Sequence, residues 1–383
     1  MIKKVFSVFA VSAIIVSSLS LAGCSSSSNI DETKLTGKYD KSLSGTTLNV
    51  YNWGEYISDG AEGSINVERE FERLTGINVS YTTYDSNESM YSILKSGSVS
   101  YDIIIPSDYM IQRLASENML KKIDTSKLAN YGNIDPRYKG MYYDENNEYS
   151  VPYNVGMVGL VYNSTMVEGT PDSWGILFDE KYSGKLLTFN NPRDAFGIAQ
   201  MYLGKDVNST DKKDWDEAAE LLSKQKKLLK KFVMDDVFSL MQTGETAVAP
   251  YYAGDCVTML ENNSELRFFY PKEGTNIFVD AVCIPSSAQN VEAAMMFIDF
   301  LLEPQIALAN AQYINYASPN LTVSGNKEYL DSLTVELDDG TEFNYSSMLY
   351  PSESEMPKTQ YFYDLDVDTR SYYESLWNSI LAE

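Results

Sequence analysis

The sequence contains no histidine and only three cysteines in 383 residues. Histidine is the commonest zinc ligand, and the two cysteines in the body of the chain, Cys256 and Cys283, lack the spacing of metal ligands. The sequence therefore indicates neither a metal site nor a cofactor. The absence of histidine also means that mild acidification adds no positive charge to a side chain.

Positive charge is scarce, because 30 basic residues face 54 acidic ones and the formal net charge is −24. This charge disfavours binding to nucleic acid or to an anionic membrane surface, and it attracts cations. In many proteins an acidic composition only keeps the chain soluble. Here the 29 tyrosines are also many for a chain of this length, so the composition has a second unusual feature. Hydrophobic and charged contents of 44% and 22% are ordinary for a folded chain.

The only long apolar run lies at the N-terminus and is too short for a comfortable membrane span. "MIKK" is basic, "VFSVFAVSAIIV" is apolar, and "LAGC" precedes "SSSSN". This is the layout of an export signal. "LAGC" resembles the lipobox of bacterial lipoproteins, which implies that Cys24 is lipidated, that residues 1–23 are removed, and that residues 24–44 form a tether. A plain cleaved signal is the alternative. Both remaining cysteines are expected to be buried, and a disulfide between them stays open in an exported protein.

The first part of the body alternates strands and helices. Strands are predicted at 47–53, 77–84 and 101–106, and helices at 65–74, 86–97 and 109–120. This βαβαβα order predicts an α/β fold with right-handed crossovers. Further on, 149–163 and 278–288 read as two strands that cross between lobes, helices are predicted at 214–232 and 291–312, and "LDDGTEF" predicts a hairpin.

Three strand-end loops combine aromatic residues with acids or hydroxyls: "NWGEY", "YDSNE" and "PSDY". The loops after parallel strands lie along one edge of the sheet, where ligands bind. Together these loops predict a site for a cationic ligand with an apolar body. Asp85 in the second loop is predicted as a helix cap rather than a ligand contact.

Longer stretches resemble the spermidine/putrescine-binding proteins of bacterial ABC transporters over essentially the whole mature chain. They are "YNWGEYI", "YTTYDSNESMY", "YDIIIPSDY", "KIDTSKLANYGNIDP", "YSVPYNVG", "YPKEGTNIFVDAVCIP", "FIDFLLEP" and "INYASPN". The resemblance implies a two-lobed periplasmic-binding-protein fold of type II, in which each lobe is a mainly parallel sheet flanked by helices and two crossing strands form the hinge. It implies lobe 1 at 45–152 and 284–319, and lobe 2 at 153–283 and 320–383.

The resemblance also implies the function. The protein would capture a polyamine between the lobes and deliver it to the permease subunits of an ABC importer, without catalysis. It would be a monomer on the cell surface or in the periplasm, held through Cys24 to the outer face of the cytoplasmic membrane. A polyamine needs anions for its ammonium groups and flat apolar walls for its methylene chain, and aromatic faces also attract the cation.

Carried over position by position, the resemblance implies twelve ligand contacts: Trp53, Glu55, Tyr56, Ser107, Tyr109, Asn191, Asp194, Tyr252, Phe278, Asp280, Tyr316 and Glu374. Three positions depart from the family pattern. Gly54 stands where some relatives have threonine, Asn191 where many have aspartate, and Glu374 where a glutamine is frequent. These departures leave the preferred polyamine open. Arg193 lies in the middle of the proposed site, and we expect it to form a salt bridge that orients a carboxylate.

Two other classes of function stay open on the residues alone. A secreted glycosidase would use paired carboxylates and aromatic sugar platforms. A binding protein of the same fold could instead take a sugar or a ferric ion, the latter held by a tyrosine pair with carboxylates.

Overall fold

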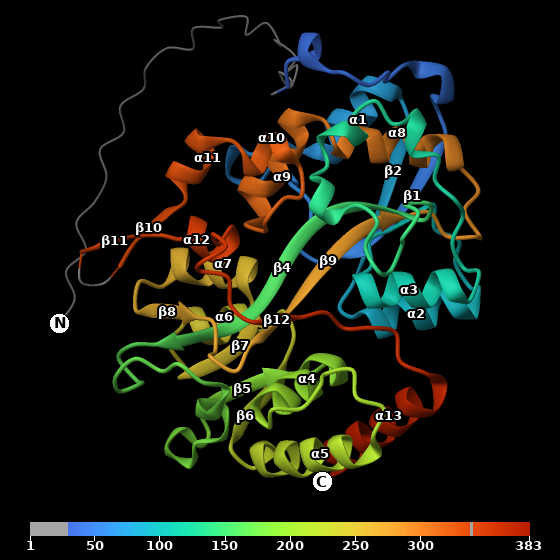
Figure 1. Cartoon of the computed structure of the whole chain (residues 1–383). Helices are drawn as coiled ribbons and strands as arrows, with labels where there is room; N and C mark the ends of the chain where they lie inside the picture. The colour runs from blue at the N-terminus through green and yellow to red at the C-terminus, as the bar shows by residue number, and fades with distance from the viewer. Residues whose placement is uncertain (1–29, 338–339) are drawn as a thin grey trace, which may run out of the picture.

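The computed structural model describes residues 30–337 and 340–383, and it is built around one curled sheet (Figure 1). The strand order is β2-β1-β3-β9-β4-β7-β5-β6, with β12 beside β9 and β8 beside β4. These strands are β1 (Thr47–Trp53), β2 (Asn78–Tyr84), β3 (Ile103–Ile104), β4 (Ser150–Asn163), β5 (Leu186–Phe189), β6 (Leu229–Val233), β7 (Val248–Tyr252), β8 (Leu266–Phe269), β9 (Thr275–Cys283) and β12 (Thr359–Gln360). A separate pair, β10 (Thr334–Glu336) and β11 (Glu342–Asn344), is antiparallel.

Thirteen α-helices are found in the described residues. They are α1 (Val67–Thr75), α2 (Asn87–Ser96), α3 (Asp108–Ser116), α4 (Pro192–Tyr202), α5 (Lys212–Lys226), α6 (Val237–Gln242), α7 (Ala253–Asn262), α8 (Val291–Leu301), α9 (Pro304–Ile314), α10 (Leu321–Ser324), α11 (Lys327–Ser332), α12 (Ser346–Leu349) and α13 (Val367–Ala382). None of the helices in these residues is long and apolar enough to cross a membrane.

The sheet has two parallel ends joined by two long antiparallel strands. β1 pairs in parallel with β2 and β3, and β5 pairs in parallel with β6 and β7. Between them β4 and β9 pair with each other, and every residue of both strands is buried. The predicted α/β class and two-lobed architecture are therefore confirmed, and β4 and β9 are the two crossing strands (Figure 1). Below, lobe 1 is the half with β1–β3 and lobe 2 the half with β5–β7; the residue boundaries given above stay predictions.

Local sequence explains where the first helices begin and end. Asn66 caps α1 by accepting a hydrogen bond from the backbone N–H of Arg69 (2.8 Å), and the helix ends at Gly76 with φ of +70°. A reciprocal pair of hydrogen bonds between Ser86 and Ser89 starts α2. Both helices agree with the predicted ranges because these signals are local.

Three predicted helices are shorter or divided in the structure, and the one predicted at 109–120 ends at Ser116. The helix predicted at 214–232 stops at Lys226, since residues from Leu229 to Val233 pair with β5 as an edge strand. The helix predicted at 291–312 divides into α8 and α9 at Pro304, whose ring nitrogen cannot donate to the preceding turn. The predicted hairpin is present as β10 and β11, while Asp338 and Asp339 of its turn lie outside the described residues.

The described part of the predicted tether, residues 30–44, packs on lobe 1 rather than hanging free. Ile30 is buried in the core of that lobe, and Tyr39 donates a hydrogen bond to Glu303 (2.9 Å). The backbone N–H groups of Thr36 and Gly37 also donate to Glu303 (2.8 and 2.7 Å). Cys24 lies outside the described residues, so its lipidation stays a prediction.

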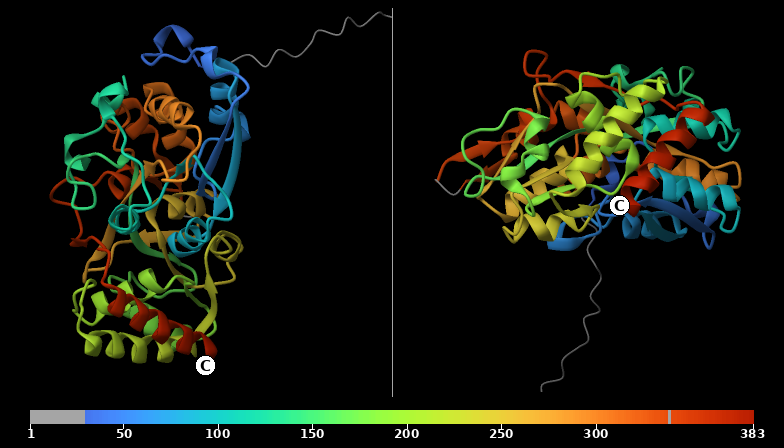
Figure 2. Two further views of the ribbon diagram at one scale, coloured as in Figure 1. Left: turned by 90° about the vertical axis from the view of Figure 1, so that its right-hand side faces the viewer. Right: turned by 90° about the horizontal axis from the view of Figure 1, so that it is seen from below.

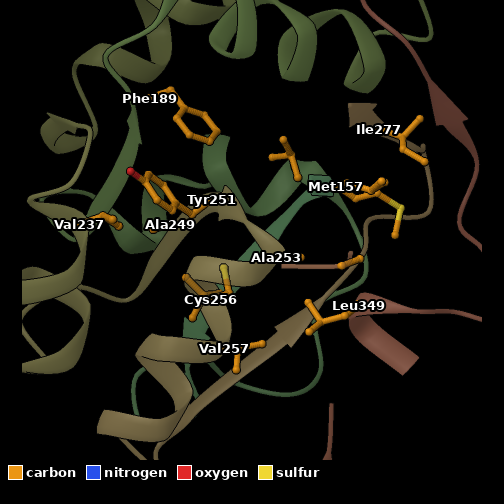
Figure 3. Packing of buried hydrophobic residues seen from close by; sticks show 14 of the residues in the cluster. Met157, Phe189, Val237, Ala249, Tyr251, Ala253, Cys256, Val257, Ile277 and Leu349 are labelled. Carbon is orange, nitrogen blue, oxygen red and sulfur yellow. The ribbon is translucent and has the colours of Figure 1, made fainter. Parts of the chain in front are cut away.

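One apolar core runs from lobe 1 into lobe 2, and on the lobe 2 side Phe189 stacks on Tyr251 near Cys256 (Figure 3). Cys256 and Cys283 are both fully buried and both are free thiols, so the disulfide that the sequence left open does not form. Their burial agrees with the expectation for small apolar side chains.

A third connection between the lobes follows β12. Residues 361–366, which we call the strap, run from β12 to α13, and α13 then packs along α5 at the far end of lobe 2 (Figure 2). On the lobe 1 side, Tyr142 donates to the carbonyl oxygen of Phe362 (2.5 Å) and Gln112 accepts from the N–H of Asp364 (2.8 Å). On the lobe 2 side, Asn208 donates to the carbonyl oxygen of Tyr361 (2.8 Å), so the strap is bonded to both lobes.

Candidate ligand-binding site

A cavity lies between the lobes and has a space of about 720 Å³ including its open mouth. Its lining comes from both lobes, from β9 and from the strap: Trp53, Gly54, Tyr56, Tyr84, Asp85, Asn87, Ser107, Asp108, Tyr109, Asn191, Arg193, Asp194, Met234, Asp235, Tyr251, Tyr252, Asp255, Asn276, Phe278, Asp280, Tyr316 and Phe362. Most of these residues follow the carboxyl ends of parallel strands, as the sequence predicts for such a fold.

Three helices begin at the cavity, and each carries an aspartate in its first turn. These are Asp108 of α3, Asp194 of α4 and Asp255 of α7. A helix N-terminus attracts anions through its free N–H groups and dipole. Here each N-terminus has its own carboxylate beside it, so the local charge offered to a ligand is negative. The arrangement therefore suits a cation.

Asp280 lies on β9 in the middle of the lining and is 3% exposed. Tyr56 donates a hydrogen bond to its Oδ2 (2.5 Å), while Oδ1 has no hydrogen-bond partner among the described residues. Burial raises the pKa of Asp280 to about 6, although hydrogen bonds from Ser107 and Tyr56 act in the opposite direction. A buried carboxylate oxygen without a donor is costly, and a bound ammonium would supply one.

Asp194 is held at one side of Asp280 by two neighbours. Its Oδ2 accepts hydrogen bonds from Tyr252 (2.8 Å) and from Asn191 Nδ2 (2.7 Å). Asn191 also caps α4, because its Oδ1 accepts from the N–H of Arg193 (2.9 Å). Burial raises the pKa of Asp194 to about 7.

Asp255, which is half-buried, provides a third carboxyl group in the cavity, and sequence reasoning missed it. Tyr316 donates to its Oδ2 (2.9 Å), and burial raises the pKa of Asp255 to about 8 despite that hydrogen bond. Asp280 contributes electrostatically to the raised pKa of both Asp194 and Asp255. Each of the three aspartates thus has one tyrosine donor, and Asp280 lies within electrostatic range of the other two.

Aromatic rings form the walls between these acids. The rings of Tyr56 and Tyr316 meet at 5.1 Å between centroids, and those of Tyr252 and Phe278 at 5.5 Å. The Trp53 indole N–H donates to the carbonyl oxygen of Ile105 (2.8 Å), so the ring is fixed against lobe 1. Such walls suit an alkyl chain and add cation–π attraction to its charged ends.

Arg193 behaves differently from the expectation. It is 1% exposed, but its guanidinium donates to the carbonyl oxygen of Val207 (2.8 Å) and to Asn208 Oδ1 (2.7 Å), and it forms no ion pair with a described residue. Its guanidinium carbon lies 4.1 Å from the centroid of the Phe362 ring. Arg193 therefore connects α4 to residues 207–208 and to the strap, and it does not orient a carboxylate.

Ten of the twelve predicted contacts line the cavity; Glu55 and Glu374 do not. Glu55 follows β1 in a left-handed conformation (φ +52°) and is exposed. Glu374 lies on α13 and lines a separate outer groove with Lys95, Arg113 and Arg370. In the structure Glu374 therefore lies away from Asn191, which lines the cavity.

Several lining residues were missed by sequence reasoning. Asp108, Asn276 and Asp255 lie within three positions of a predicted contact in the sequence. Their nearness to Tyr109, Phe278 and Tyr252, respectively, was therefore a usable signal. Phe362 belongs to the strap, whose short, irregular stretch gives no periodic pattern. Only the folded chain brings it to the cavity.

The chain was compared with protein families and solved structures. Residues 67–333 match the family described as bacterial extracellular solute-binding protein. A spermidine/putrescine-binding periplasmic protein of Salmonella typhimurium is 33% identical over 338 residues, which cover 88% of this chain and 92% of the relative. A structure from Listeria monocytogenes, assigned to a spermidine/putrescine ABC transporter, gives a TM-score of 0.79 at 33% identity and covers 88% of this chain and 99% of that one. The Tp0655 lipoprotein of Treponema pallidum gives 0.73 at 26% identity, with 87% and 99% covered.

Proposed function

Because the chain belongs to the family of bacterial extracellular solute-binding proteins, we propose that it binds a polyamine, spermidine or putrescine, between its lobes and passes it to an ABC importer. The Salmonella relative carries these two ligands in its name and is similar over nearly its full length. Relatives of this kind serve transport, and we propose the same role, without catalysis, for this chain.

The observation that carries the proposal is the set of acids in the cavity without a basic partner. Asp194, Asp255 and Asp280 all line the cavity. None of the three forms an ion pair with a described residue. Burial raises the pKa of all three carboxyl groups, so their charged forms need a cation nearby. A polyamine supplies the missing positive charges, and its methylene chain fits between the aromatic rings.

The other classes receive less support. Within the described residues, no three or more Asp, Glu, Cys or His side chains are grouped to hold a metal ion, which argues against a ferric-ion site. The family match and the similarity to transport-associated relatives argue against a glycosidase. A neutral sugar would leave the carboxylates of the cavity without counter-ions.

Location and attachment are part of the same proposal. The family is extracellular, and we place the protein on the outer face of the cytoplasmic membrane, held by a lipid on Cys24. The "LAGC" motif and the similarity to a Treponema lipoprotein support this anchor. Permease subunits of the importer are the proposed partners, and the binding protein acts as a monomer.

A thermal-shift series with spermidine, putrescine and a neutral sugar tests the function. Ligand at a hundred times its dissociation constant adds about 2.7 kcal/mol to the free energy of unfolding. We expect at least one polyamine to raise the melting temperature and the sugar to leave it unchanged. A shift with the sugar and none with either polyamine would refute the proposed function.

A further inference from the structure

The mouth of the cavity carries one carboxylate from each lobe. Asp85 follows β2 in lobe 1, and Asp235 follows β6 in lobe 2. Both line the cavity and both are exposed to solvent, unlike the buried aspartates inside. Neither belongs to the contacts that the sequence predicted. The pair therefore marks the point where the two lobes meet at the opening.

Asp235 approaches the backbone of lobe 1 at Gly54. A Cβ atom added to Gly54 would lie 3.2 Å from Asp235 Oδ2, so a side chain at position 54 would press on this carboxylate. Asp85 also acts on Asp235: burial raises the pKa of Asp235, the hydrogen bond from Tyr251 lowers it, and Asp85 raises it further. Both acids line the same cavity, and Asp235 lies within electrostatic range of Asp85.

Neither acid has a positive partner. Asp85 accepts a hydrogen bond from the Ser89 hydroxyl (2.8 Å), and Asp235 Oδ1 accepts one from Tyr251 (3.4 Å). In the described part of the chain, neither forms an ion pair; the nearby Lys231 pairs with Asp236 instead. Two acids of like charge on opposing lobes repel each other whenever the lobes approach without a cation between them.

A second observation shows that the cavity behind this mouth is built for a donor-bearing ligand. Asp280 and Asn276 both line it and are 3% and 4% exposed. Asp280 Oδ1 and Asn276 Oδ1 are buried without a hydrogen-bond partner among the described residues. Asp85 and Asp235 line the same cavity as these two unpaired acceptors, which N–H groups of a ligand would satisfy.

We propose that Asp85 and Asp235 form a cation subsite that holds an ammonium group of the ligand between the lobes and makes closure depend on the ligand's charge. This inference rests on the proposed polyamine-binding function. An ammonium between the two carboxylates replaces one repulsion with two attractions, each to a different lobe, so it favours the closed state. A neutral ligand of the same shape leaves the repulsion in place.

Conservative substitutions test the subsite because asparagine keeps the shape and still accepts the hydrogen bond, from Ser89 at position 85 and from Tyr251 at position 235. Asp85→Asn and Asp235→Asn are each expected to weaken spermidine binding by about three- to tenfold at low salt, and less at high salt, because exposed charges are screened. Asp236→Asn is the matched control: it lies next to Asp235, is paired with Lys231, and does not line the cavity. The control is expected to bind as the wild type does, with affinities measured by calorimetry.

Closure is followed separately by small-angle scattering of the ligand-free proteins. Without the repulsion, the Asp85→Asn/Asp235→Asn double variant is expected to have a smaller radius of gyration than the wild type. Unchanged affinity in both single variants would overturn the subsite, and an unchanged radius in the double variant would overturn the charge-dependent closure. If the wild type itself bound no polyamine, the proposed function would fail rather than this inference alone.

Discussion

Asp280 combines burial, a fixed position on β9 and one free carboxylate oxygen. Tyr56 holds Oδ2, and the backbone of β9 pairs with β4, so the carboxylate cannot move away from the ligand. From the sequence, this residue was implied by the resemblance to the family, and its burial in an apolar strand agrees with a role for its charge, because a buried charge is costly unless it is paired. It missed Asp255, although that aspartate lies only one helical turn after Tyr252.

Replacing Asp280 with asparagine keeps the shape and removes the charge. Loss of one partner of a buried charge pair costs about 2 to 5 kcal/mol, so the affinity for every polyamine is expected to fall by about 1.5 to 3.5 decades. Glu374→Gln is the control, because Glu374 lines the outer groove and not the cavity. Calorimetry with both ligands measures the effect. Wild-type affinity in Asp280→Asn would show that the carboxylate is not the ammonium's partner.

Protons compete with the ligand for three aspartates of the cavity. The pKa of Asp280, Asp194 and Asp255 is raised to about 6, 7 and 8 in the ligand-free protein, chiefly by burial. A raised carboxyl pKa stabilises the folded state below about pH 4, and this contribution is lost as the pH rises through about 6 to 8. A cationic ligand favours the ionised forms, so binding releases protons.

Polyamine affinity is therefore expected to increase from about pH 6 to pH 8, and the ligand-free protein to lose stability over the same interval. Calorimetry in two buffers with different ionisation enthalpies counts the released protons. Asp255→Asn is expected to release fewer of them near pH 8 than the wild type does. Equal heats in both buffers together with a pH-independent affinity would contradict the coupling.

At the scale of elements, local signals gave the most reliable predictions. The caps of α1 and α2 are formed by residues within four positions of each helix start, and both helices agree with the predicted ranges. β6 was taken for helix because "KQKKLLKK" continues a helical pattern, and only pairing with the distant β5 makes it a strand. The strap reaches the cavity through contacts with Tyr142, Gln112 and Asn208, all far away in sequence.

The segment that was predicted from the sequence to be a tether can be removed to test whether it stabilises lobe 1. Ile30 is buried in lobe 1, and Tyr39 bonds Glu303. A chain that begins at Thr46 is expected to lose about 2 to 5 kcal/mol of stability, from the burial of two or three apolar side chains. Its polyamine affinity is expected to match that of a chain that begins at Ile30, because no residue of the segment lines the cavity.

Denaturant unfolding of the two truncated chains, followed by circular dichroism, measures the difference. Equal midpoints would mean that residues 30–45 add no stability, and that their packing on lobe 1 is too weak to position the chain. A large loss of polyamine affinity in the shorter chain would instead show that this segment acts on the cavity through lobe 1.

For the whole molecule, function depends on two lobes that share one ligand. Trp53 and Tyr56 come from lobe 1, Asp194 and Tyr252 come from lobe 2, and Asp280 lies on a crossing strand. A ligand that contacts all of them favours the state in which the lobes are close. The two-lobed form was predictable from the alternation of elements and the two crossing strands, whereas the third connection through the strap was not.

Small-angle scattering is expected to show a smaller radius of gyration for the wild type with saturating spermidine than without it. Asp280→Asn at the same ligand concentration is expected to keep the ligand-free radius, because the central ammonium lacks its partner. A wild-type radius that does not change at saturation would contradict a mechanism in which the ligand brings the lobes together.

A calorimetric titration of the wild-type protein, from residue 30 onward, with spermidine and then putrescine is the most direct test of polyamine binding. We expect saturable binding of at least one of them, with one ligand per chain and an affinity that falls when salt is added. No saturable heat with either polyamine, in a sample that melts cooperatively, would contradict it.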